Sequence, residues 1–193
     1  MGILRNDTYT VNQDNGFMAR AKGRRVTEQR WAGTDFITAP TVNGVALCVS
    51  CERRGRCQLG LGREELLPDG SVETSLVCSA DHEGGPGVAH GGWIAAMFDE
   101  VTGHVTLLSR QLAVTGAMSV TYLKPVPIER PLTARAWVDR KEQGRWYVVG
   151  ELRLSSTGAL LGRAEATMVL RDPGHFERHR QWLAQQDQLA TGS

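Results

Sequence analysis

The sequence lacks the features that mark several classes of protein. No apolar run approaches the roughly 20 residues that a membrane-spanning helix needs, and residues 1–16 contain no apolar stretch of the kind found in signal peptides. The formal net charge is +1, from 22 basic and 21 acidic residues, so charge gives no reason to expect nucleic acid or an anionic membrane as a partner. Four cysteines in 193 residues do not form a disulfide scaffold. We therefore expect a cytoplasmic protein with no nucleic-acid and no membrane partner.

The composition that is present is that of a globular domain with extended ends. Hydrophobic residues make up 41% and charged residues 22% of the chain, both near the globular average. Residues 1–45 are polar and show no sustained hydrophobic period, so we expect an N-terminal extension there. We place the folded domain at residues 46–171. Residues 172–193 begin with Asp-Pro, which is typical of a helix start, and predict a short C-terminal helix and tail.

The clearest secondary-structure signal is a helix from Gly91 to about Ser109. Its apolar residues form one stripe about 100° wide. They are Ile94, Met97, Phe98, Val101, Val105 and Leu108. Extended segments separated by turn signals surround this helix, and the glycine-rich segment 83–92 predicts a loop. The expected strands are 58–67, 72–80, 114–123, 132–140, 145–154 and 159–170. This order predicts an α+β domain, in which an antiparallel sheet wraps around one long central helix.

The start of this helix is the best candidate for a chemical site. His90, Gly91 and Gly92 stand where the first backbone N–H groups of the helix have no internal acceptor and the helix dipole is positive. Such N–H groups can polarise a carbonyl group and stabilise an oxyanion. Asp99 lies off the apolar stripe, on a helix face of small residues. It is therefore the candidate general base or nucleophile.

The spacing of these residues predicts a dimer. Nine residues separate His90 from Asp99, which is about 13.5 Å along a helix. One reacting carbon therefore cannot contact the Gly91 N–H and the Asp99 carboxylate of the same chain. If both groups act in one site, they come from two antiparallel copies of the helix, in a twofold dimer with two composite sites.

Three segments resemble one known family. They are 87–100 (GVAHGGWIAAMFDE), 114–115 (VT) and 120–126 (VTYLKPV). In this order and spacing they resemble the hotdog-fold acyl-CoA thioesterases of the phenylacetate-pathway (PaaI-like) type, over about residues 46–171. The resemblance implies the hotdog fold, with subunits that pair edge to edge into dimers and often into tetramers.

The resemblance also implies roles for particular residues. The Gly91 N–H, with Gly92 next to it, would form the oxyanion hole, and His90 would position the thioester. Asp99 of the partner subunit would activate water or attack directly, and Thr115 matches an assisting hydroxyl residue. No metal or redox cofactor is required. Some relatives carry an asparagine six residues before the motif histidine, where this chain has Gly84.

The expected function is therefore hydrolysis of an acyl-CoA, or of another acyl thioester, by a homo-oligomeric enzyme. A hydratase would need a different arrangement of histidine and acid, for which no segment matches. A non-catalytic hotdog module that senses acyl-CoA would be expected to carry a helix-turn-helix, and residues 1–45 show no two-helix pattern. An inactive structural protein would not need His90, Gly91 and Asp99 together. The acyl group and the choice between dimer and tetramer stay open.

The cysteine spacing leaves three interpretations open. Cys48, Cys51 and Cys57 follow the pattern C-x2-C-x5-C, which resembles part of a zinc site. Cys78 or His82 could supply a fourth ligand. A disulfide or redox pair is the second interpretation, and ordinary reduced thiols are the third and preferred one.

Overall fold

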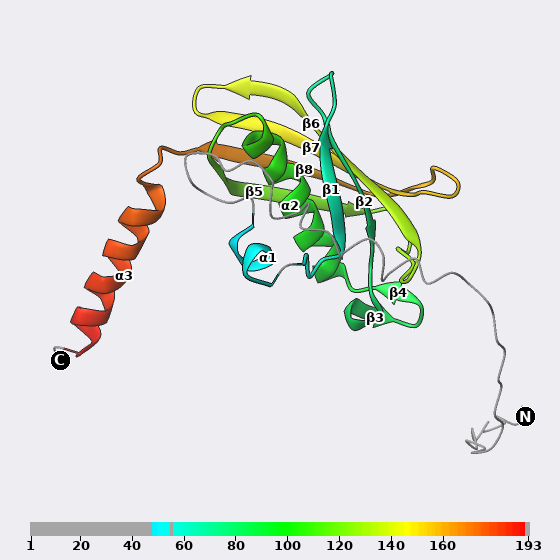
Figure 1. Ribbon diagram of the computed structural model, residues 1–193, viewed down its shortest axis with the longest axis horizontal. Helices are drawn as coiled ribbons and strands as arrows, with labels where there is room; N and C mark the ends of the chain where they lie inside the picture. The colour runs from blue at the N-terminus through cyan, green and yellow to red at the C-terminus, as the bar shows by residue number, and fades with distance from the viewer. Residues whose placement is uncertain (1–47, 55, 192–193) are drawn as a thin grey trace, which may run out of the picture.

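The computed structural model describes residues 48–54 and 56–191 of the chain. In chain order the elements are α1 (Val49–Arg54), β1 (Leu61–Leu66), β2 (Val72–Val77), the 3-10 turn η2 (Ala80–His82), β3 (Glu83–Gly85), β4 (Val88–Ala89), α2 (Gly91–Leu108), β5 (Ala113–Tyr122), β6 (Pro131–Glu142), β7 (Arg145–Leu154), β8 (Leu160–Leu170) and α3 (His175–Thr191). Figure 1 shows the sheet curving around α2, with α3 standing apart from both.

Six strands form one antiparallel sheet in the order β1-β2-β6-β7-β8-β5. The predicted α+β architecture, a sheet wrapped around one long helix, is confirmed. Strands β6, β7 and β8 follow one another through short turns, so local hairpins build the centre of the sheet. Strand β5 follows α2 and pairs only with β8, so it forms one edge of the sheet among the described residues. This edge strand becomes important for the site.

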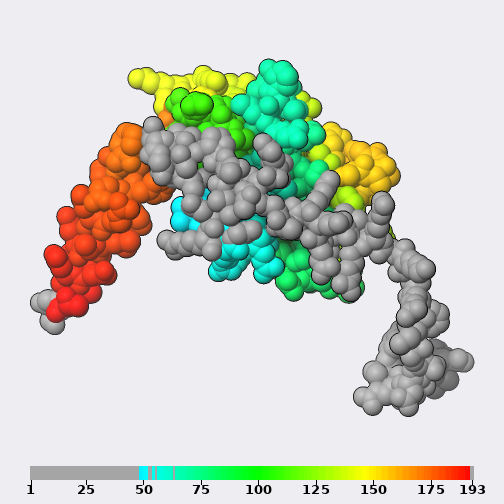
Figure 2. Space-filling view, in the orientation of Figure 1, coloured from blue at the N-terminus to red at the C-terminus, as the bar shows by residue number. Residues whose placement is uncertain are grey.

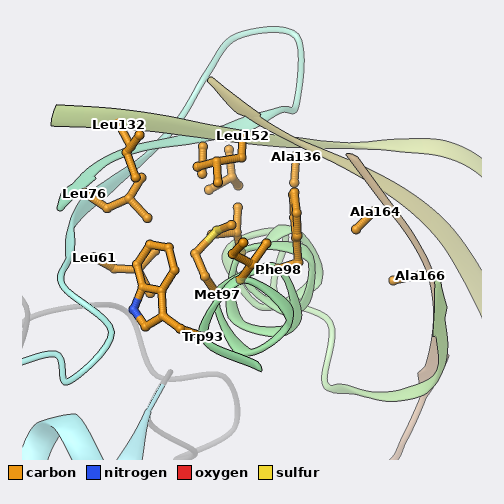
Figure 3. Packing of buried hydrophobic residues seen from close by; sticks show 14 of the residues in the cluster. Leu61, Leu76, Trp93, Met97, Phe98, Leu132, Ala136, Leu152, Ala164 and Ala166 are labelled. Atoms are coloured by element: carbon orange, nitrogen blue, oxygen red, sulfur yellow. The ribbon is translucent and has the colours of Figure 1, made fainter. Parts of the chain in front are cut away.

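The core fills the concave side of the sheet against α2. Met97, Phe98 and Val101 are fully buried on the helix, and Figure 3 shows Phe98 and Met97 pointing from the helix toward the sheet. Helix α2 packs closely against strand β7 at Gly150, where an added Cβ would lie 3.0 Å from the Phe98 ring. The predicted apolar stripe therefore is the face that the sheet covers. The buried face is wider than predicted, because Trp93, His104 and other residues beside the stripe are buried as well.

Three local features differ from the sequence-based expectation. Strand β2 ends at Val77 instead of continuing to residue 80, because the chain turns into η2 there. The segment expected to be a loop contains the small β3–β4 hairpin. The cysteine-containing stretch after residue 47 forms the six-residue helix α1, for which the sequence showed no period. The predicted extension, residues 1–45, lies outside the described residues.

The C-terminal helix predicted after Asp172 is present as α3 (His175–Thr191). None of its residues is buried, and in the space-filling view its orange-to-red surface forms an arm beside the body (Figure 2). Within the described part of the chain, no helix has the length and apolar character needed to cross a lipid bilayer.

Candidate active site

The N-terminus of α2 is built around His90, which is the N-cap residue. Its backbone is extended, with φ −62° and ψ 138°, and its N–H donates to the carbonyl of His82 at 2.8 Å. Its ring Nδ1 accepts the Gly92 N–H at 2.9 Å, so the neutral ring carries its proton on Nε2. The Gly91 N–H meets no acceptor among the described residues. This leaves one backbone donor at the positive end of the helix dipole.

The loop before α2 holds His90 in place through a close backbone contact. A Cβ added at Gly84 would lie 2.7 Å from the His90 Cα, a distance that real Cβ atoms do not adopt. Any side chain at position 84 would clash with the His90 backbone. This explains why the chain has glycine where some relatives carry asparagine. The chain uses glycine to pack the β3 strand against the His90 backbone, and offers no polar side chain there.

Tyr122 contacts the predicted site residue Gly91, although sequence reasoning assigned Tyr122 no role. It lies in the segment 120–126 that resembles the family motif. Its hydroxyl donates to the Gly91 carbonyl at 3.2 Å, which ties the end of β5 to the first turn of α2. Beside this contact lies an open cavity of about 330 Å³. Val88, Ala89, Gly91, Ile94, Tyr122, Leu123, Lys124, Pro125 and Val126 line it. The contact joins residues 31 positions apart, so local sequence patterns do not predict it. The only sequence signal for Tyr122 was its place in the segment that resembles the family motif.

Asp99 and Thr115 form the second group of predicted site residues. The Thr115 hydroxyl donates to Asp99 Oδ1 at 2.6 Å, and both residues are exposed. The pairing of β5 with β8 shifts register between Thr115 and Ala117. Such irregularities re-aim side chains in edge strands. Asp99 keeps its second carboxylate oxygen, Oδ2, outside this hydrogen bond.

Within one chain the structure brings the predicted residues together in two groups. His90, Gly91 and Gly92 lie at the first turn of α2, with Tyr122 beside them. Asp99 lies about two turns further along the helix, where its side chain meets Thr115 of β5. Eight residues from Gly91 to Asp99 correspond to about 12 Å of helix. The two groups therefore lie well apart within a single copy of the chain.

A second cluster of titratable groups lies on the opposite side of α2, inside the protein. His104 is 2% exposed; its Nδ1 lies 2.5 Å from the Glu64 carboxylate and its Nε2 lies 3.1 Å from Glu100 Oε2. Burial opposes protonation of His104, but the two carboxylates outweigh it and raise its pKa to about 10. The imidazole is therefore charged at neutral pH. This cluster is remote from Gly91 and Asp99 in orientation and belongs to the core.

The four cysteines are unpaired, and Cys51, Cys57 and Cys78 are buried. Burial raises the pKa of Cys48 and of Cys78 to about 11, so these thiols stay protonated at neutral pH. Among the described residues, no group of three histidine, cysteine or acidic side chains has an arrangement suited to a metal ion.

The sequence was compared with known families and proteins. Residues 86–159 match the model of the thioesterase superfamily. The chain is similar to acyl-coenzyme A thioesterase THEM4 of Mus musculus, with 30% identity over 118 residues that cover 59% of this chain and 51% of the mouse protein. The chain therefore spans about half the length of the curated relatives it matches.

Solved structures support the same fold. A putative thioesterase of Ralstonia eutropha, described as related to phenylacetic acid degradation, has 26% identity and a TM-score of 0.52, covering 62% of this chain and 97% of that one. Zebrafish thioesterase superfamily member 2 has 18% identity and a TM-score of 0.56, covering 69% of this chain and 100% of the other. The sheet wrapped around α2 thus defines a hotdog-fold domain. Residues 86–159 are similar to the thioesterase superfamily, and the resemblance of the helix motif to hotdog-fold thioesterases is confirmed.

Proposed function

We propose that this protein hydrolyses acyl-CoA thioesters to the free acid and CoA, in two composite sites between two copies of the chain. The observation that carries this proposal is the arrangement of the half-sites about β5. Gly91 is tied to Tyr122 at the end of that strand, and Asp99 is tied to Thr115 near its start. The outer edge of β5 has no strand partner within the described residues.

Antiparallel pairing of two β5 strands joins these half-sites. In such a pair the start of one strand lies beside the end of the other, so Thr115 of one copy approaches Tyr122 of the second copy. Asp99 then faces the Gly91 of the second copy, because each is tied to its strand neighbour. The pairing is twofold and gives two equal sites. It also covers a row of backbone groups that an exposed edge strand leaves unpaired.

The Gly91 half-site is suited to the thioester carbonyl. The free Gly91 N–H would donate to the carbonyl oxygen and strengthen that bond as negative charge develops there. His90, which carries its ring proton on Nε2, would orient the thioester through that donor. The cavity beside Gly91 has an apolar wall that includes Val88, Ile94 and Leu123, so it would accept an apolar part of the substrate.

The Asp99 half-site is suited to activating water. Thr115 occupies one carboxylate oxygen, so the other, Oδ2, would accept a proton from water as the water oxygen attacks the thioester carbon. Collapse of the tetrahedral intermediate breaks the C–S bond, and the proton passes to the CoA sulfur. Direct attack by Asp99, followed by hydrolysis of the mixed anhydride, would use the same placement. The mouse relative is an acyl-coenzyme A thioesterase, which supports thioester hydrolysis in either form.

The first test measures thiol release from short, medium, long and phenylacetyl-type acyl-CoAs. We expect wild-type turnover and a loss of roughly a hundredfold or more in Asp99→Ala, the scale of general-base contributions. Asp139→Ala is the matched control, because Asp139 is also an exposed aspartate but lies on β6 away from the site. A wild-type protein that binds these acyl-CoAs and releases no thiol would instead be a non-catalytic acyl-CoA-binding module.

The second test examines the composite site directly. Gly91→Pro deletes the N–H at the first helical position, where proline is tolerated, and the extended His90 backbone suits a following proline. We expect a loss of about 10²–10³-fold, as for other oxyanion donors. Gly91→Ala is the control, because it keeps the N–H and its Cβ would meet only the Tyr122 ring at 3.6 Å.

Mixing the two inactive variants completes this test. A dimer of one Asp99→Ala copy and one Gly91→Pro copy has one doubly damaged site and one intact site. Statistical reassociation of equal amounts should therefore restore about a quarter of the wild-type activity. Sites contained within single chains would show no recovery, and that result would overturn the composite arrangement.

A further inference from the structure

Helix α3 leaves the sheet in a fixed direction. The Arg171 N–H donates to the Leu112 carbonyl at 2.8 Å, which holds the chain against the start of β5. Asp172 then accepts the Gly174 N–H at 2.9 Å and two bonds from the Arg178 guanidinium, at 2.9 and 2.6 Å. The Arg178 hydrogen bonds lower the pKa of Asp172 to about 2. The first turn of α3 is thus hydrogen-bonded to Asp172, two residues after β8 ends at Leu170.

The two faces of α3 differ in their side-chain contacts: one forms ion pairs and hydrogen bonds, and the other exposes apolar side chains. On the polar face, Glu177 pairs with Arg180 and accepts a hydrogen bond from Gln181. On the other face, Phe176, Trp182 and Leu183 are 39%, 53% and 42% exposed. Most helices in proteins gain their stability from packing an apolar face against other elements, yet none of the 17 residues of α3 is buried. We therefore expect the apolar face of α3 to pack against another apolar surface.

The position of α3 indicates which partner. Leu170 pairs with Ala113, the first residue of β5, and α3 begins five residues beyond Leu170, so the helix leaves the sheet from the end where β5 starts (Figure 1). In the proposed dimer the start of β5 lies beside the end of β5 of the second copy. Tyr122 and Leu123, at that end, are 54% and 48% exposed. The dimer thereby places the exposed apolar face of α3 close to the exposed apolar residues Tyr122 and Leu123 of the second copy.

Charge favours a second copy of the chain over a membrane surface. Helix α3 carries Arg178 and Arg180 against Glu177 and Asp187, which gives it no net charge, and both arginines are engaged with carboxylates. Helices that lie on anionic membranes are instead rich in unpaired basic residues on the polar face. The apolar face therefore fits an apolar protein surface.

We propose that α3 of each copy packs its Phe176–Trp182–Leu183 face on Tyr122 and Leu123 of the second copy. This proposal rests on the β5-paired dimer of the proposed function. Tyr122 and Leu123 line the cavity beside Gly91, so α3 forms an outer wall of the partner's composite site. The helix thereby becomes an interaction surface that adds apolar contact area where the acyl thioester enters.

Cross-linking between copies tests this placement in the full chain. Leu123→Cys copies are mixed with Phe176→Cys or Leu183→Cys copies, allowed to exchange subunits, mildly oxidised and run on a non-reducing gel. Gln181→Cys is the matched control, because Gln181 lies between the two test positions along α3 but on the opposite face. Leu123→Cys alone measures the background from the four native cysteines. We expect several-fold more cross-linked dimer with the two apolar-face cysteines than with Gln181→Cys.

The oligomeric state and thioesterase activity of the same samples separate the possible failures. A monomeric wild type would overturn the β5 dimer, and this proposal with it. An active dimer whose cross-linking is equal on both faces of α3 would overturn this proposal alone. Equal cross-linking together with co-sedimentation of the wild type on phosphatidylserine vesicles would assign α3 to a membrane surface instead.

Discussion

Helix α2 carries two acidic residues side by side, Asp99 and Glu100, and they point into opposite environments. Asp99 is exposed and pairs with the hydroxyl of Thr115. Glu100 turns inward to His104, which is 2% exposed and also contacts Glu64. The inward cluster has the strongly perturbed pKa, whereas the outward pair lies beside the free sheet edge.

This difference shows that a strongly shifted pKa does not by itself mark the candidate catalytic residues in this protein. A shifted pKa in a cleft is a common guide to active sites, but here the shift follows from burying an imidazolium between two carboxylates. The candidate chemistry lies in the solvated pair, because that pair can meet water and a second copy of the chain. Glu64, Glu100 and His104 would instead hold β1 against the helix that presents Asp99.

The largest expected effect comes from breaking the inward cluster. Glu64→Ala leaves a buried imidazolium with one carboxylate fewer, and we expect the free energy of unfolding to fall by about 3–5 kcal/mol. Urea unfolding measures it. Arg153→Ala is the control, because Arg153 is 44% exposed in its pair with Glu151, and exposed pairs contribute at most about 1 kcal/mol. Equal losses in both variants would contradict the structural role of the cluster.

The same cluster predicts a pH dependence of stability. The pKa of His104 is about 10 in the folded protein against 6.5 for the free side chain, so its contribution is full below pH 6.5 and is lost as pH rises through 10. Between pH 6.5 and 8 stability should fall by up to about 1.4 kcal/mol per pH unit. Urea unfolding across this range, which lies below thiol titration, checks the slope. His104→Gln should flatten it, and an unchanged slope in that variant would assign the dependence to other groups.

Breaking the outward pair should affect activity and spare stability. Thr115→Val removes the donor to Asp99 but suits a strand, and we expect kcat to fall about tenfold, since hydrogen bonds to charged groups are worth 1.5 kcal/mol or more. Thr115→Ser keeps the hydroxyl and should stay near wild type. Steady-state kinetics with the preferred acyl-CoA, together with urea unfolding, separates the two effects. A Thr115→Val protein with lost stability and normal kcat would reverse the comparison.

The sequence predicted the parts of this molecule that depend on local pattern. The stripe from Ile94 to Val105, the strands after α2 and the C-terminal helix all follow from spacing and turn residues, and all are present. The helix begins at His175 and not directly after Asp172, so the predicted helix start at Asp-Pro is too early. The motif indicated the hotdog resemblance and put Asp99 and Gly91 at separate positions along one helix. The rise of a helix per residue then gave the distance between them.

The rest depends on contacts between distant segments. Glu64 lies 40 residues from His104, so the sequence showed a histidine beside Glu100 on the helix without the strand carboxylate that holds it charged. Gly84 was given no role from the sequence, because the contact that requires glycine is with the His90 backbone, which only the fold reveals. Helix α1 has no periodicity of its own.

The smallest expected effect on activity comes from removing the Tyr122 hydroxyl, which contacts the Gly91 end of the proposed site. Tyr122→Phe keeps the ring on Gly91 and removes only the hydroxyl that donates to the Gly91 carbonyl. A hydrogen bond between neutral groups contributes about 0.5–1.5 kcal/mol, so kcat/KM should fall only a few-fold. Stability should stay unchanged, since Tyr122 is 54% exposed. Steady-state kinetics beside Thr115→Val makes the measurement. A loss as large as that of Asp99→Ala would mean that the Tyr122 hydroxyl contacts the reacting thioester, and the oxyanion site would then have two donors instead of one.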